Sequence, residues 1–227
     1  MLLANKLFAG IAVGFMLTAV GPANAVPVLD QEYSPDPNVP PVGHATVGQN
    51  SVPSIKNMGQ TFTVGITGIL SAIEVRVAKA PHIIEDLTLD LRTPDGSLPG
   101  LAGATLASAS LSAGNIPDTV FSYISFDLSG AGIDVEAGDF LSFVLSSLEL
   151  KDRLDAYRIS NSGAEGGYDG GDGFHSLSHD GGNFAATNDL FFRTFVEVPE
   201  PGSLAVLGLG LFVLASARRR RPRTNLI

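Results

Sequence analysis

The chain has 227 residues, of which 44% are hydrophobic, with no cysteine and a formal net charge of −9. The absence of cysteine excludes disulfide bonds and thiol catalysis. Between Val26 and Val198, 22 acidic residues face 8 basic ones, and this net charge of −14 opposes binding to nucleic acid or anionic lipid, while it could attract divalent cations.

The first 25 residues have the three parts of a secretory signal peptide. Lys6 precedes an uncharged apolar run at 7–20, and Ala23 and Ala25 form a cleavage site of the A-x-A kind. We therefore expect a signal helix at 1–25 that is removed, so that the mature chain begins at Val26. The alternative, a permanent N-terminal anchor, fits less well because the run is short and a cleavage site follows it.

The middle of the chain predicts an all-β domain. Residues 26–57 are rich in proline, which indicates an extended leader with room for one edge strand. From residue 58 to residue 198, apolar and polar residues alternate with period two and no long stretch has a helical period. The clearest runs are 73–77, 87–91, 124–128, 141–145 and 190–198. Short strands in this pattern predict an antiparallel β-sandwich or jelly roll.

The C-terminal tail at 198–223 combines an extended strip, an apolar segment and a basic cluster. The strip is formed by Val198, Pro199, Glu200 and Pro201. Its prolines prevent it from joining a helix. The uncharged segment at 204–217 would span about 21 Å as a helix, which is short for a permanent transmembrane anchor. The basic cluster begins with Arg218, Arg219, Arg220 and Arg221, which predict a cytoplasmic C-terminus and transient membrane insertion.

This order of strip, helix and arginines resembles the PEP-CTERM sorting signal of Gram-negative bacteria. The resemblance implies that a membrane-embedded exosortase recognises the chain and cuts it near Pro-Glu-Pro. It also implies delivery to the cell surface or matrix and, because carriers commonly accompany exopolysaccharide production, extracellular polysaccharide as a partner. The same tail is sometimes labelled an ice-binding protein C-terminal domain, which is no evidence of ice binding. The alternative is an ordinary single-span anchor.

A second resemblance covers about residues 55–198. Short motifs occur in the order 59–64, 89–93, 98–100, 138–145 and 189–194. Their order is similar to a jelly-roll module of bacterial secreted proteins, the choice-of-anchor group. This resemblance implies a surface domain without an assigned activity, with carbohydrate-binding proteins among its relatives.

The sequence offers little for catalysis. It contains neither a G-x-S-x-G elbow nor an H-E-x-x-H zinc helix. The possible bases are His44, His82, His175 and His179. The last two lie four residues apart in a loop, where that spacing gives no common face. Scattered carboxylates cannot be assigned to a glycosidase pair. We therefore expect no catalytic residues and no enzyme.

The segment at 166–183 is the most unusual part of the middle region, because it is rich in glycine and aspartate. Asp169, Asp172 and Asp180 are hard oxygen ligands that a structural Ca²⁺ favours, although Asp and Gly are also ordinary loop residues. Tyr157 and Tyr168 could form an aromatic platform for a sugar near this loop, together with Phe174.

Three functions are consistent with these features. The favoured one is a non-enzymatic protein of the cell envelope or matrix, associated with exopolysaccharide. A carbohydrate-binding module of the same layer is the alternative, and a secreted hydrolase is the least favoured.

Overall fold

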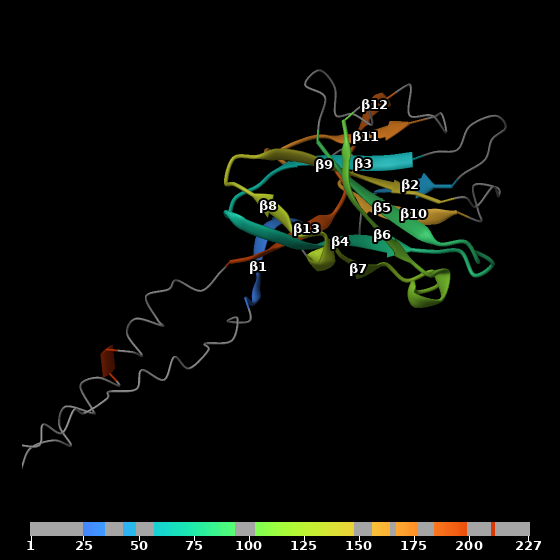
Figure 1. Cartoon of the computed structure of the whole chain (residues 1–227). Coiled ribbons are helices and arrows are strands. Elements are labelled where there is room, and N and C mark those ends of the chain that lie inside the picture. The colour runs from blue at the N-terminus through green and yellow to red at the C-terminus, as the bar shows by residue number, and fades with distance from the viewer. Residues whose placement is uncertain are drawn as a thin grey trace, which may run out of the picture.

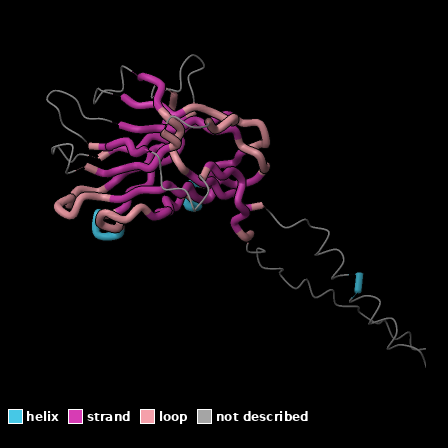
Figure 2. Tube along the Cα trace, turned by 180° about the vertical axis from the view of Figure 1, so that it is seen from behind, coloured by secondary structure: helices cyan, strands magenta, loops and turns pink. Residues whose placement is uncertain are grey.

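The computed structural model describes residues 25–34, 43–48, 57–93, 103–147, 156–163, 167–176, 184–198 and 210–211. These residues form thirteen β-strands and two short 3₁₀ helices, and the strands make two antiparallel sheets that face each other (Figure 1). Seen from behind, strands make up most of the described domain and loops join their ends (Figure 2). The prediction of an all-β, two-sheet sandwich is therefore confirmed.

One sheet, the β4 sheet, is built around the longest described strand. Its members are β1 (Pro27–Tyr33), β2 (Gly43–Val47), β4 (Gly68–Ala78), β7 (Ser122–Asp127), β8 (Ile133–Val135), β10 (Tyr157–Asn161) and β13 (Phe192–Glu197). Because β7 and β8 pair along one side of β4, β13 and β10 lie end to end along the other side. β1 then borders β13, and β2 borders β10.

The other sheet, the β3 sheet, has the strand order β12-β11-β3-β9-β5-β6. Its members are β3 (Asn57–Thr63), β5 (Leu87–Arg92), β6 (Thr105–Leu111), β9 (Phe140–Ser146), β11 (Gly173–Ser176) and β12 (Phe184–Thr187). The two 3₁₀ helices, η1 (Ala113–Asn115) and η2 (Ser129–Ala131), lie in the connections before and after β7.

The core lies between the sheets and is built from the alternating apolar residues of the sequence. Leu87, Leu89 and Leu91 of β5 are fully buried, as the period of two predicts. Phe62 and Phe143 of the β3 sheet meet Phe192 of the β4 sheet, with ring centroids 6.0 and 5.6 Å from that of Phe192. Each fully buried side chain of this size stabilises the fold by roughly 1.5–3 kcal/mol.

The segment predicted as an extended leader, 26–57, contributes more strand than expected. β1 and β2 both lie within it, and each forms an outer strand of the β4 sheet. Proline is tolerated at the first position of an edge strand, which explains Pro27 at the start of β1. Asp30 fixes β1 in place, because its carboxylate accepts hydrogen bonds from the backbone N–H groups of Gly65 and Ile66 and from the hydroxyl of Thr194. Strands thus begin at Pro27, within the segment predicted as a leader.

The helices predicted at the two ends lie largely outside the described residues. The signal helix at 1–25 meets the described chain only at Ala25, and the apolar helix at 204–217 only at residues 210 and 211, which are helical. Within the ranges that the structure describes, no helix has the length and hydropathy needed to cross a membrane.

Candidate functional site

The described part of the sorting tail leaves the domain at the end of β13. Glu197, the last residue of this strand, pairs with Ile69 on one side and with Pro27 on the other. Val198 is 36% exposed and Val26 is 70% exposed. The expected mature N-terminus and the start of the sorting strip therefore emerge side by side from the β4 sheet.

Of the predicted processing residues, the structure describes Ala25, Val26 and Val198. Ala25 is partly buried just before β1. The other residues of this prediction lie outside the described ranges, namely Ala23, Pro199, Glu200, Pro201, Arg218, Arg219, Arg220 and Arg221.

The Asp/Gly-rich segment is attached to β3 through main-chain groups. The backbone oxygen of Asp172 accepts a hydrogen bond from the backbone N–H of Thr61 at 3.0 Å, and its N–H donates to the Thr61 hydroxyl at 2.7 Å. Thr63 donates through its hydroxyl to the oxygen of Gly170 at 2.9 Å. The carboxylates of Asp169 and Asp172 are on exposed residues. This part of the chain is thus held in a defined shape without using its acidic side chains.

The predicted calcium ligands are not brought together as a set among the described residues. No group of three histidine or acidic side chains in those ranges is arranged to hold a metal ion. Asp180, the third predicted ligand, lies outside them. The segment 166–183 also contains β11, where a continuous loop was expected.

Asp189, a residue that the sequence analysis missed, organises this region from the inside. It is only 9% exposed, and its Oδ1 accepts hydrogen bonds from Gln60 Nε2 at 3.0 Å and from the N–H of Gly173 at 2.6 Å. Its Oδ2 accepts from the N–H of Tyr168 at 2.9 Å. Gln60 is fully buried and accepts in turn from the N–H of Leu190. A buried carboxylate with three donors is a strong constraint on the loop.

An open pocket of about 450 Å³ lies beside this network, with Gln31, Tyr33, Tyr168 and Asp169 in its lining. The Tyr168 hydroxyl donates to Gln31 Oε1 at 3.0 Å, and the rings of Tyr33 and Tyr168 have centroids 5.9 Å apart. Burial raises the pKa of Tyr168; a hydrogen bond from the backbone of Thr63 opposes this shift, and the charge of Asp30 adds to it. Tyr168 therefore stays protonated near neutral pH. The pocket thus presents two tyrosine rings and one exposed carboxylate.

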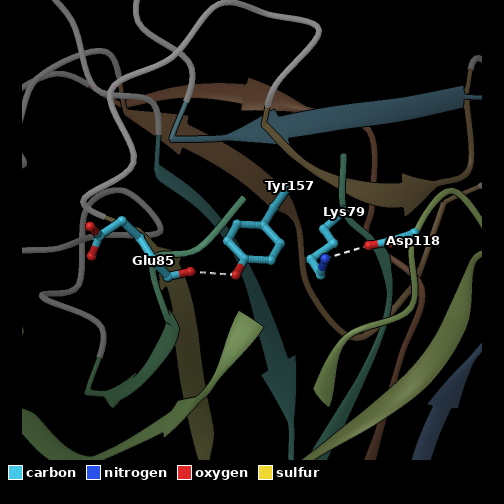
Figure 3. Close-up of polar contacts among 4 residues, drawn as sticks. All are labelled: Lys79, Glu85, Asp118 and Tyr157. Carbon is cyan, nitrogen blue, oxygen red and sulfur yellow. Dashed lines mark hydrogen bonds and ion pairs between the residues drawn. The ribbon is translucent and has the colours of Figure 1, made fainter. Parts of the chain in front are cut away.

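Tyr157, the other tyrosine predicted for a sugar platform, lies in the core. It is fully buried, and its hydroxyl donates to the backbone oxygen of Glu85 at 2.6 Å (Figure 3). The same view shows Lys79, which is 7% exposed, paired with Asp118. Phe174 is also fully buried. The tyrosine ring that lies beside Tyr168 in the pocket is instead that of Tyr33 on β1. Sequence analysis did not select Tyr33 because it lies in the proline-rich segment.

The described histidines lie on separate elements. His44 is on β2, His82 is in the turn after β4, and His175 is on β11. His179 lies outside the described residues. This distribution gives no common site in which these three side chains could share a catalytic task.

The comparisons with known proteins agree with the reading of the tail. No curated protein matches the chain. Residues 197–221 match the PEP-CTERM protein-sorting motif, which begins at the last residue of β13 and includes the strip, the apolar segment and the four arginines. A motif of this kind is processed by an exosortase. It marks the chain as a C-terminally sorted protein that is exported to the cell envelope or surface of a Gram-negative bacterium.

Proposed function

We propose that the chain is a non-enzymatic protein of the cell envelope or extracellular matrix that an exosortase-type enzyme cuts from a transient membrane anchor. We also propose that it acts together with exopolysaccharide. The observation that carries the proposal is the sorting motif at 197–221, which follows directly on the folded β-domain. The domain ahead of it is acidic and free of cysteine, as suits a protein that stays folded outside the cell through packing alone.

The sorting motif starts where the folded β-domain ends, so the domain and the tail have separate roles. β13 is paired on both sides up to Glu197, so the sheet ends where the motif begins. The prolines on either side of Glu200 disfavour strand ladders and helices in the next residues, as suits a strip that an enzyme binds. The apolar residues at 204–217 are enough to hold the chain in the membrane briefly, and the arginines hold its C-terminus on the cytoplasmic side.

Processing can be tested with two tail variants expressed in a host that has an exosortase. One replaces Pro199, Glu200 and Pro201 with alanine, and the other replaces the four arginines at 218–221 with glutamine. We expect the wild-type chain at the surface with a mass that lacks the tail, and both variants uncut in the membrane fraction. Thr224→Ala, beyond the matched motif, is the control and should be processed normally. Normal cutting and location of both variants would refute the proposal.

A carbohydrate-binding module is the second candidate, and the pocket at Tyr33 and Tyr168 favours it. Aromatic rings beside hydrogen-bonding side chains are the usual means of holding a sugar in such pockets. A glycan array probed with wild type and with Tyr33→Ala tests this function. Signals that vanish in the variant would support it, and the absence of any wild-type signal would count against it.

A further inference from the structure

The outer side of the β4 sheet carries a concentration of arginine that is unusual for this domain. Of the 8 basic residues between 26 and 198, three project from it. They lie on different strands, Arg76 on β4, Arg158 on β10 and Arg193 on β13. Their inward-facing neighbours, such as Val75, Val77 and Ile159, are fully buried, so the arginines point away from the core. We call these residues, with Phe121 and Tyr123, the arginine face.

Two of the arginines stack on aromatic rings from the β7 side of β4. The Cζ atom of Arg193 lies 4.0 Å from the centroid of Tyr123, and that of Arg158 lies 5.8 Å from the centroid of Phe121. Arg158 is paired with Ala78, whose small side chain lets the guanidinium reach across β4. Stacking uses the flat side of a guanidinium and leaves its N–H groups free at the edge.

The three arginines differ in their charge partners. Arg193 pairs with Glu32 at 2.8 Å and with Glu74 at 3.6 Å. Partial burial alone would lower its pKa, but the hydrogen bond and charge of Glu32, together with Tyr123 and Glu74, raise it. Among the residues that the structure describes, neither Arg76 nor Arg158 has a carboxylate partner.

The arginine face also holds buried polar atoms without hydrogen bonds. Nε of Arg158 and the hydroxyl oxygen of Tyr123 are buried, and neither has a hydrogen-bond partner. Buried polar atoms in native proteins are normally satisfied, so these two groups lack the internal hydrogen bonds that would tie down their side chains. Although the domain has 22 acidic residues, no described carboxylate neutralises Arg76 or Arg158.

We propose that Arg76 and Arg158 bind a carboxylate-bearing polysaccharide on the outer side of the β4 sheet. Carboxylates match the guanidinium fork in a bidentate manner. The two side chains lie on neighbouring strands, offset by two residues, which places them within roughly 7–8 Å and within reach of one short polymer segment. The net charge of −14 repels a polyanion from the rest of the domain, so binding is confined to the arginine face and should weaken with salt.

The choice of a polysaccharide rests on the proposed surface location, whereas the arginine face stands on geometry alone. The pocket at Tyr168 is a poor alternative for this ligand, because it is lined by Asp169 and is close to Asp30. A polymer on the arginine face would instead pass over the opposite end of the sheet from β1, near His44, whose ring lies 6.4 Å from that of Phe121.

Binding can be measured with the full chain in a non-ionic detergent, using polygalacturonate as the probe and its methyl-esterified form as the uncharged control. We expect binding to polygalacturonate that weakens with salt, and little binding to the ester. Arg76→Gln and Arg158→Gln should each weaken binding about tenfold. Arg92→Gln is the matched control, because it removes the same charge from the β3 sheet, where Arg92 pairs with Asp90.

The variants Arg76→Lys and Arg158→Lys keep the positive charge but lose the bidentate geometry of the guanidinium group, so they should bind with intermediate affinity. This result separates the loss of bidentate binding from a loss of folding. No wild-type binding to polygalacturonate would overturn the proposal, as would equal weakening by Arg92→Gln. Poly-glutamate binding as tightly as the polysaccharide would also overturn it, because the partner would then be an acidic peptide. None of these results bears on the cutting of the tail, so the proposed sorting stands or falls on its own test.

Discussion

Replacing Asp189 with alanine should destabilise the domain through the Asp/Gly segment. The carboxylate accepts three hydrogen bonds, from Gln60 Nε2 and from the N–H groups of Tyr168 and Gly173, at 2.6–3.0 Å. All three donors would lose their acceptor in a region where Gln60 is fully buried and Asp189 is 9% exposed. The loss is therefore not readily made good by water.

The size of the effect follows from these contacts. At about 1.5 kcal/mol for each hydrogen bond to a charged group, the low end of the usual range, the three bonds sum to about 4.5 kcal/mol before any offset. Relief of the carboxylate's own desolvation offsets part of it, so we expect a loss of about 2–4 kcal/mol in the free energy of unfolding. Asp189→Asn should cost about half as much, because its amide oxygen keeps two donors while its NH₂ group faces the N–H of Tyr168.

The assay is urea unfolding of residues 26–198, followed by circular dichroism and analysed as a two-state transition. Asp169→Ala is the matched control, since it removes an exposed carboxylate from the same segment and should change stability by no more than about 0.5 kcal/mol. A loss below about 1 kcal/mol for Asp189→Ala, or equal losses in the two variants, would refute the reasoning.

Three further predictions concern other described contacts. The folded state raises the pKa of Tyr168, so the stabilising contribution of this residue is complete below the unfolded pKa of about 10 and is lost at higher pH. The difference in unfolding free energy between wild type and Tyr168→Phe should therefore shrink above about pH 10. A difference that stays constant with pH would contradict this. Asp118→Asn leaves the buried ammonium of Lys79 without its carboxylate and should lower the free energy of unfolding by about 1–3 kcal/mol in chemical denaturation. Lys79→Met, which removes the buried charge itself, should cost less. The reverse order of the two losses would contradict this prediction. Gly59→Ala places a methyl group against the ring of Phe174 and the backbone oxygen of Phe143, and it should lower stability by about 1–3 kcal/mol in chemical denaturation. No loss in this variant would contradict the packing.

The parts of the fold that could be predicted from the sequence are those with large aliphatic side chains at alternate positions. β5, with its three leucines, was predicted, whereas β6 (Thr105–Leu111) was not, because its alternation is between alanine and serine and carries little hydrophobic signal. Only one edge strand was expected among the prolines at 26–57, whereas both β1 and β2 lie there and form the two outer strands of the β4 sheet. β11 was missed because a glycine-rich sequence reads as loop until pairing with β3 supplies its hydrogen bonds.

Functional features could be predicted where their residues are adjacent in the sequence and could not where distant residues come together. The sorting tail could be predicted because all its parts are adjacent in the sequence, and the matched residues, 197–221, nearly coincide with the predicted 198–223. The network at Asp189 could not, because Gln60 lies 129 residues away and no local pattern links the two. Tyr157 shows the converse error, since its position near an interesting loop suggested exposure while its neighbours in β10 alternate into the core.

The pairing of β1 with β13 connects the two ends of the chain. Pro27 lies opposite Glu197, so the strand that would follow signal-peptide cleavage borders the strand that leads into the sorting motif. β1 is an edge strand with little buried surface, yet Asp30 attaches it to Thr194 of β13 and to the turn before β4. Because β1 supplies the outer pairing of β13 up to Glu197, β1 helps to fix the end of the paired strand, where the sorting motif begins. A chain whose N-terminal strand had not docked would present the motif as the continuation of a half-paired strand, and the folded β4 sheet avoids that state.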